Sequence, residues 1–170
     1  MQPPNTACLI EHRPQRRLLE FAAYRWPQTN GATPSWPVDA GAVVRDSNDA
    51  ASLLHFAPGR VLAPDPSAAT ETLLDVAAAG GAGTRIDATG KWEHYIVRGL
   101  GAARLLACAI ELGAVLDKRD CAAVTLFDCP AIVAKWRDGF ELWIQSSYAG
   151  DFLATAQRFR ASLEQLDYAR

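Results

Sequence analysis

The feature of this sequence that most restricts its fold is the order of its apolar runs between Trp92 and Leu166. Four short runs rich in aromatic and β-branched residues have the composition of strands, and two longer runs have helical spacing. Along the chain they predict strand, helix, three strands and helix. A doubly wound fold requires regular alternation of strands and helices. This order therefore favours an α+β fold, with a mixed, mainly antiparallel sheet and helices packed on one face.

The three consecutive strands are expected to form a meander over 121–127, 131–136 and 140–145. Asp138-Gly139 between the last two is a strong signal for a two-residue hairpin turn. The first helix is expected over 101–113, with one apolar stripe and Gly113 at its end. The stripe of that helix consists of Leu105, Cys108, Ala109 and Leu112.

The last helix is expected to begin near Ser146-Ser147, because either serine can cap it. Its apolar residues are spaced four, three, four and three apart, which places them on one helical stripe. They are Phe152, Ala156, Phe159, Leu163 and Leu166.

A second set of short elements is predicted between Gly41 and Gly90. Strand-like runs occupy 42–46 and 84–87, and the segment 52–64 predicts two strands joined across Pro58-Gly59. The run over 67–81 predicts a helix that is capped by serine and ended by two glycines. We expect residues 41–170 to form a single α+β domain.

Residues 1–40 differ from the rest of the chain because they hold six of the ten prolines. Proline interrupts helices and keeps the preceding residue extended, so we expect a proline- and aromatic-rich N-terminal arm. Such an arm packs either on its own domain or on a partner, and aromatic side chains are enriched in interface cores. The candidate partner-interface residues are Phe21, Tyr24, Trp26 and Trp36.

The bulk composition excludes several classes of protein. Hydrophobic residues make up 49% and charged residues 21%, which is the composition of a globular chain and not of a disordered one. The net charge of -2 gives no basic surface for nucleic acid. No signal sequence is apparent, and no apolar run approaches the length of about 18 residues needed to span a membrane. We expect a soluble, cytoplasmic chain.

The stretch "RGLGAARLLA" raises the question of a dinucleotide-binding loop, which requires G-x-G-x-x-G/A between a strand and a helix. Gly99 and Gly101 fit the first two positions, but Arg104 stands where a small residue must pack. The strand after the helix is expected to be antiparallel, whereas the dinucleotide fold is parallel. A tight turn into a core helix is the favoured interpretation, and a nucleotide loop is the alternative.

The chemically capable side chains show no catalytic or metal-binding pattern. His12, His55 and His94 are not at ligand spacing, and no G-x-S-x-G sequence is present. The four cysteines are Cys8, Cys108, Cys121 and Cys129, and none forms a C-x-x-C pair that would favour a zinc site. Cys108 lies in an apolar helical pattern, and Cys121 and Cys129 flank a strand pattern, so small buried hydrophobes are the favoured interpretation. We therefore predict no catalytic, cofactor-binding or metal-ligating residue in this chain, which favours a binding module or a subunit over an enzyme.

Several stretches resemble the gamma subunits of sarcosine oxidases. "RIDATGKWEHYIVRGLGAARLLACAIELG" is similar to the family segment in which a "DVS"-like strand and turn precede an apolar strand, a "SGP.AR..L"-like turn and a helix. The residues that match the family pattern in this turn are Gly101, Ala103, Arg104 and Leu105. "LHFAPGRVLA" upstream resembles the family's "L.LGP..WLL" strand pair.

The C-terminal part resembles the family's "CAQT.L...P..L.R..D.FEL.V..S.A.YLW..L" region. Positions in step there are Cys121, Thr125, Leu126, Pro130, Phe140, Glu141, Leu142, Ser147 and Ala149. The same style of sequence recurs in the folate-binding domains of the glycine-cleavage T-protein. Residues 1–40 lie outside the resemblance.

The resemblance implies an accessory, gamma-type subunit of a heterotetrameric complex that oxidises sarcosine or a related N-methyl amine. In that family the alpha, beta and delta subunits are the partners, and they carry FAD, FMN, NAD, tetrahydrofolate and zinc. The gamma chain holds none of these cofactors and has a structural role. The alternative is a stand-alone folate-binding or one-carbon-transfer module, for which Asp87 or Glu141 would be the acidic residue that binds the pterin edge.

Overall fold

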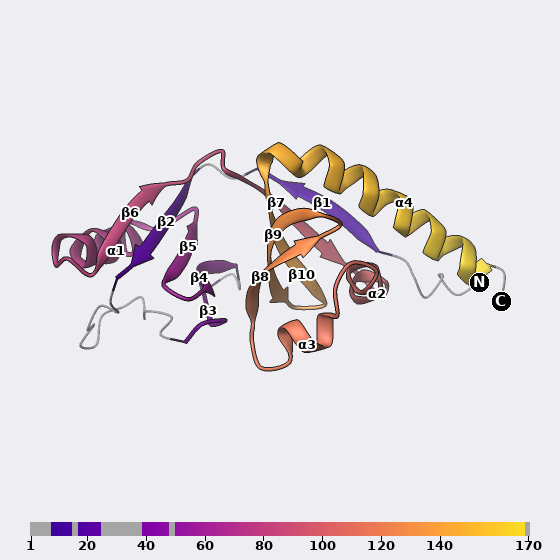
Figure 1. Ribbon diagram of the computed structural model, residues 1–170, viewed down its shortest axis with the longest axis horizontal. Helices are drawn as coiled ribbons and strands as arrows, with labels where there is room; N and C mark the ends of the chain where they lie inside the picture. The colour runs from indigo at the N-terminus through magenta and orange to yellow at the C-terminus, as the bar shows by residue number, and fades with distance from the viewer. Residues whose placement is uncertain (1–7, 15–16, 25–38, 48–49, 169–170) are drawn as a thin grey trace. The chain divides into compact units, whose positions relative to one another are not determined.

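The computed structural model describes residues 8–14, 17–24, 39–47 and 50–168, and its chain divides into two compact units (Figure 1). The first unit consists of Met1–Pro14, Trp92–Asp117 and Ala123–Arg170. The second unit consists of Gln15–Lys91 and Lys118–Ala122. Each unit contains one five-stranded sheet, and the resolved pairings are antiparallel in both. The predicted α+β class with mainly antiparallel strands is therefore confirmed.

The sheet of the first unit has the order β1-β7-β10-β9-β8. Leu142 lies opposite both Tyr95 and Val133, so these three side chains share one face. The meander predicted from the sequence forms the β8-β9-β10 side of this sheet. The bounds are β1 Leu9–Arg13, β7 Trp92–Arg98, β8 Cys121–Leu126, β9 Cys129–Trp136 and β10 Gly139–Gln145.

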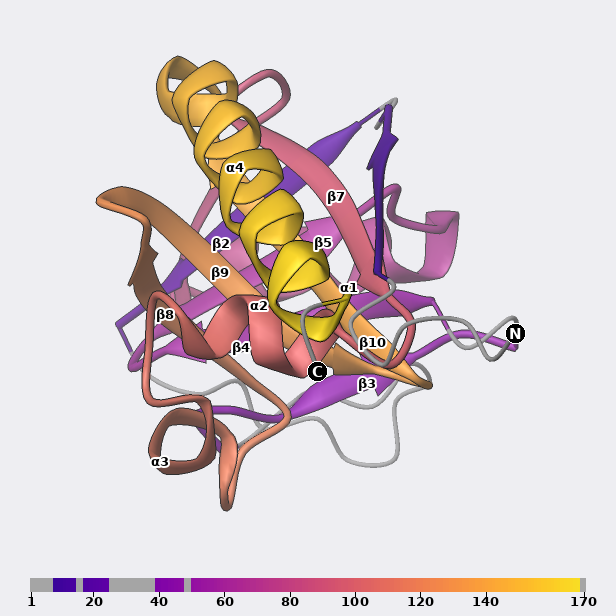
Figure 2. The same cartoon turned by 90° about the vertical axis from the view of Figure 1, so that its right-hand side faces the viewer.

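The helices of the first unit are α2 Ala102–Ala107, α3 Leu112–Leu116, the 3-10 turn η1 Ser146–Tyr148 and α4 Ala149–Tyr168. Figure 2 shows α2 and α4 together in front of the sheet. The Phe152 ring of α4 lies 5.3 Å from the ring of Tyr95 on β7 and 6.2 Å from that of Phe127. These aromatic contacts join α4 to the sheet and exclude water from its buried face.

The prediction of one helix over 101–113 is wrong. α2 ends at Ala107, and a separate short helix, α3, contains Gly113. The N–H of Cys108 donates to the carbonyl of Leu105, three residues earlier, at 3.2 Å. This is the tighter 3-10 type of hydrogen bond that often ends an α-helix. Apolar spacing continues across this break, so periodicity alone could not locate it.

The sheet of the second unit has the order β3-β4-β5-β2-β6. Helix α1, Ala68–Ala79, packs on one face of it, and the core there includes Phe21, Leu53 and Leu74. Ser67 caps α1 as predicted, because its Oγ accepts the N–H of Thr70 at 3.2 Å. The strand bounds are β2 Leu18–Ala23, β3 Val43–Arg45, β4 Ala51–Ala57, β5 Arg60–Pro64 and β6 Gly83–Asp87.

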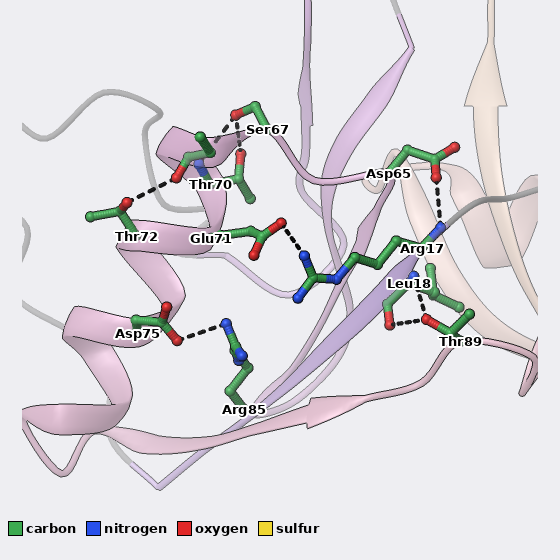
Figure 3. A network of polar contacts seen from close by, with 11 residues as sticks. Arg17, Leu18, Asp65, Ser67, Thr70, Glu71, Thr72, Asp75, Arg85 and Thr89 are labelled. Atoms are coloured by element: carbon green, nitrogen blue, oxygen red, sulfur yellow. Dashed lines mark hydrogen bonds and ion pairs between the residues drawn. The ribbon is translucent and has the colours of Figure 1, made fainter.

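Polar contacts join helix α1 to the strands beneath it, as Figure 3 shows. Arg17 donates to Glu71 at 2.6 Å, and Arg85 of β6 lies 2.7 Å from Asp75 of α1. The Leu18 N–H donates to the Thr89 hydroxyl at 3.1 Å. These contacts hold β2 in place between the helix and the turn that follows β6.

The described part of residues 1–40 differs from the predicted arm. Leu9–Arg13 is a strand of the first sheet, and Leu18–Ala23 pairs with both β5 and β6 in the second. Neither strand contains a proline. The high proline content of residues 1–40 as a whole therefore concealed these two strands. The predicted single domain over 41–170 likewise differs from the two units, because each unit combines segments from distant parts of the chain.

No helix of the described residues is long and apolar enough to cross a membrane.

Candidate functional site

The glycine stretch forms a tight turn between β7 and α2. Gly99 has φ +99, a conformation that favours glycine, and its carbonyl accepts the Ala102 N–H at 3.0 Å. β7 pairs antiparallel with both β1 and β10. A dinucleotide loop requires a parallel sheet at this point, so the predicted tight turn is confirmed.

Three segments of the first unit enclose a groove of about 730 Å³. They are the Gly99–Ala103 turn, helix α3 and the β9–β10 hairpin. Leu100, Leu112, Leu116 and Phe140 supply apolar side chains to its lining. We call this feature the α3 groove.

The hairpin side of the groove is held by a close backbone approach. A Cβ on Gly139 would lie 2.2 Å from the carbonyl oxygen of Val97, so only glycine fits. Gly139 belongs to β10 because it pairs with Trp136 of β9. The two turn residues between these strands are Arg137 and Asp138. The predicted Asp138-Gly139 turn is thus displaced by one residue.

The opposite side of the groove has free space. A Cβ built on Gly113 of α3 meets no atom within 4 Å, and this residue lines the groove. Its φ is not in the left-handed region, so a larger side chain can be placed there without backbone strain.

Charged side chains lie at the rim of the α3 groove. Asp117, Lys135, Arg137 and Asp138 line it, and all four residues are exposed. Leu116, in contrast, is buried. The groove thus has an apolar floor and an exposed rim with two charges of each sign, an arrangement suited to binding and not to general acid–base chemistry in a dry site.

The three histidines lie in separate surroundings. His12 of β1 is 2.7 Å from Glu93, and His94 stacks on Trp143 with ring centroids 4.7 Å apart. His55 is buried in β4 of the second unit. Within the part of the chain that the structure describes, no three His, Cys, Asp or Glu side chains gather as a metal site would require.

The two acidic residues considered for a pterin lie in different units. Asp87 is exposed in the second unit, and hydrogen bonds from the Thr89 hydroxyl and N–H hold its pKa below the ordinary value. Glu141 is buried on β10 of the first unit, 3.8 Å from His94. Neither residue lines the α3 groove.

Among the candidate partner-interface residues, Phe21 is fully buried inside the second unit. Tyr24 is exposed, and its hydroxyl lies 2.9 Å from that of Thr84. Trp26 and Trp36 lie outside the described residues.

Sequence reasoning missed Leu100, whose side chain is 75% exposed. An apolar residue between the two turn glycines was the available signal.

The cysteines differ strongly in accessibility. Cys121 and Cys129 are buried as predicted, whereas Cys108 is exposed because α2 ends before it. Burial raises the pKa of Cys121 to about 12 and also raises the pKa of Cys8 and Cys129. A raised pKa leaves less thiolate at neutral pH, and the thiolate is the reactive form.

We therefore expect iodoacetamide at pH 8 to alkylate Cys108 first, with Cys8 slower and the two buried thiols slowest. Peptide mass spectrometry over a time course measures the order. Cys108→Ser should remove the fast phase and leave the slow ones unchanged. Early modification of Cys121 in the folded chain would contradict this order.

Comparison with known proteins gives a structural likeness. No family model matches the sequence, and no curated protein matches it by sequence. The fold is similar to a chain of the heterotetrameric sarcosine oxidase from Corynebacterium sp. U-96, solved in complex with pyrrole 2-carboxylate. The TM-score is 0.74 at 17% identity, and the match covers 94% of this chain and 87% of the other. The two chains thus share a fold and are similar in length.

Proposed function

We propose that this chain is the gamma-type subunit of a heterotetrameric complex related to sarcosine oxidase, which oxidises a secondary N-methyl amine in the cytoplasm. The observation that carries the proposal is the structural match over nearly the whole of both chains. Because the coverage is high on both sides, the counterpart is a small chain of that heterotetramer and not one domain of a much longer one. The sequence resemblance to gamma subunits points to the same position in the complex.

The proposed role is assembly: the chain holds the catalytic subunits together and contributes no catalytic residue. The arrangement of its side chains supports this role, because the histidines lie beside different neighbours and the α3 groove has apolar side chains in its lining. In this proposal FAD, FMN, NAD, tetrahydrofolate and zinc belong to alpha, beta and delta partners.

Co-expression tests the proposal directly. The tagged chain would be produced together with the products of the genes that lie beside its own. We expect equimolar co-purification, flavin absorbance in the eluate and oxidation of sarcosine or a related N-methyl amine. A parallel preparation with the tag on an unrelated chain controls for nonspecific capture. Elution of the chain alone, with no flavoprotein attached, would refute the proposal.

A further inference from the structure

We propose that the α3 groove receives an amphipathic segment of a partner subunit, with Leu100 as the apolar contact at its rim. This inference rests on the proposed function and specifies the surface that meets the partner. The groove is formed entirely within the first unit, by residues from 99–103, 112–117 and 135–140.

The distribution of polarity favours a protein segment over a small molecule. Small-molecule sites bury most of the ligand and place a few polar groups inside an enclosed, apolar cavity. In the α3 groove the charged residues are all exposed, whereas Leu116 is buried and Leu112 and Phe140 are partly buried. An apolar centre with a polar, solvent-accessible rim is the anatomy of a protein–protein interface.

Leu100 gives a second, independent reason. Its side chain is 75% exposed on a turn whose conformation is fixed by Gly99. A ligand that contacts only the less exposed apolar residues of the groove would leave much of the Leu100 side chain in water. A partner segment that lies across the groove would cover the floor and Leu100 together, and burying such apolar surface stabilises association.

The rim charges define the chemistry of the segment. Lys135 and Arg137 with Asp138 give the hairpin side a net positive charge, and Asp117 gives the α3 side a negative one. The complementary segment therefore carries an acidic residue facing the hairpin and a basic residue facing Asp117, with apolar side chains between them.

Two substitutions test the groove without disturbing the folded chain. Leu100→Asp places a charge on a side chain that is already exposed. Gly113→Trp places a large ring at the groove from a position where an added Cβ meets no atom within 4 Å. Each variant should weaken assembly with the flavoprotein subunits by at least about tenfold, because a charge or a bulky ring in the groove removes apolar contacts that the partner segment would bury. The melting temperature of the isolated chain should fall by no more than a few degrees, as is usual for surface substitutions.

The matched control is Val76→Asp on α1, where the side chain is 66% exposed but lies in the second unit. This variant should assemble like the wild type. A charge variant, Lys135→Glu, should slow association at low salt, and this effect should shrink as the salt concentration rises.

The alkylation rate of Cys108 provides a second readout of assembly. It lines a smaller depression that shares Leu112 and Gly113 with the α3 groove. Assembly should therefore slow its alkylation, and the protection should be lost in Leu100→Asp when the two preparations are compared at equal subunit concentrations.

The possible outcomes are distinct. If the wild type assembles but both groove variants assemble equally well with Cys108 unprotected, the groove inference fails and the proposed function stands. If the wild type captures no flavoprotein, both fail. If sedimentation shows that the isolated chain self-associates through the groove and Leu100→Asp abolishes this, the occupant is a second copy and the partner assignment is overturned.

Discussion

Replacing Arg60 and Lys91 together with methionine should lower the free energy of unfolding by about 3 kcal/mol, because it leaves a buried carboxylate without a cation. Glu20 of β2 is 1% exposed. The Arg60 guanidinium contacts one oxygen of its carboxylate, and the Lys91 ammonium contacts the other. The Lys91 Nζ lies 3.0 Å from Glu20 Oε2. Methionine retains much of the apolar stem of each side chain, so packing changes less than charge. Urea unfolding measures the difference.

The reverse substitution should cost much less. Glu20→Met removes the buried charge, while Arg60 and Lys91 are half-exposed and regain hydration. Replacing a buried ion by an apolar residue of similar size is often close to neutral, so we expect a loss below about 1 kcal/mol. Arg85→Met is the control for an exposed ion pair with Asp75, and it should also cost no more than about 1 kcal/mol. A larger loss in Glu20→Met than in the double variant would show that the carboxylate is not the costly group.

Phe152→Ala should destabilise the chain by about 3–5 kcal/mol, which is the cost of a large cavity in a packed core. The Phe152 side chain is fully buried and contacts Tyr95 and Phe127. The matched control lies two turns along the same helix. Phe159 is 40% exposed and stacks on Phe127 at 5.1 Å, so Phe159→Ala should cost about 1 kcal/mol.

Thermal and urea unfolding of the two variants measure both effects on the same helix. Equal losses would show that α4 buries its whole apolar stripe in solution. A small loss for Phe152→Ala would mean that α4 is not anchored to the sheet through this ring.

The stripe on α4 illustrates what periodicity predicts and what it leaves out. Phe152, Ala156 and Leu163 are buried as predicted, whereas Phe159 is 40% and Leu166 57% exposed. Helical spacing identifies the side chains that share a face. It does not report where the supporting sheet ends beneath that face.

The strands show the same division. The turn pair Pro58-Gly59 and the serine cap of α1 are local signals, and the structure contains both features where they were predicted. The strand Leu18–Ala23 was missed because its partners, β5 and β6, lie about forty and sixty residues further along the chain. Pairing over such distances leaves no local mark.

The α3 groove could not be predicted at all. Its lining comes from three segments separated in the sequence, and each appears there as an ordinary turn, short helix or hairpin. Exposure of Leu100 depends on how α3 and the β9–β10 hairpin lie beside the turn. Likewise, Cys108 became accessible only because α2 ends at Ala107.

The sequence alone thus determined the α+β class, the meander, the capped helix α1 and the rejection of a nucleotide loop, because turn chemistry, capping and side-chain periodicity act within a few residues. Only the tertiary structure decided the division into two sheets, the burial of Phe21 and Glu20, and the existence of the α3 groove. These features depend on which distant segments pack together, and packing free energy is shared among residues that no local pattern connects.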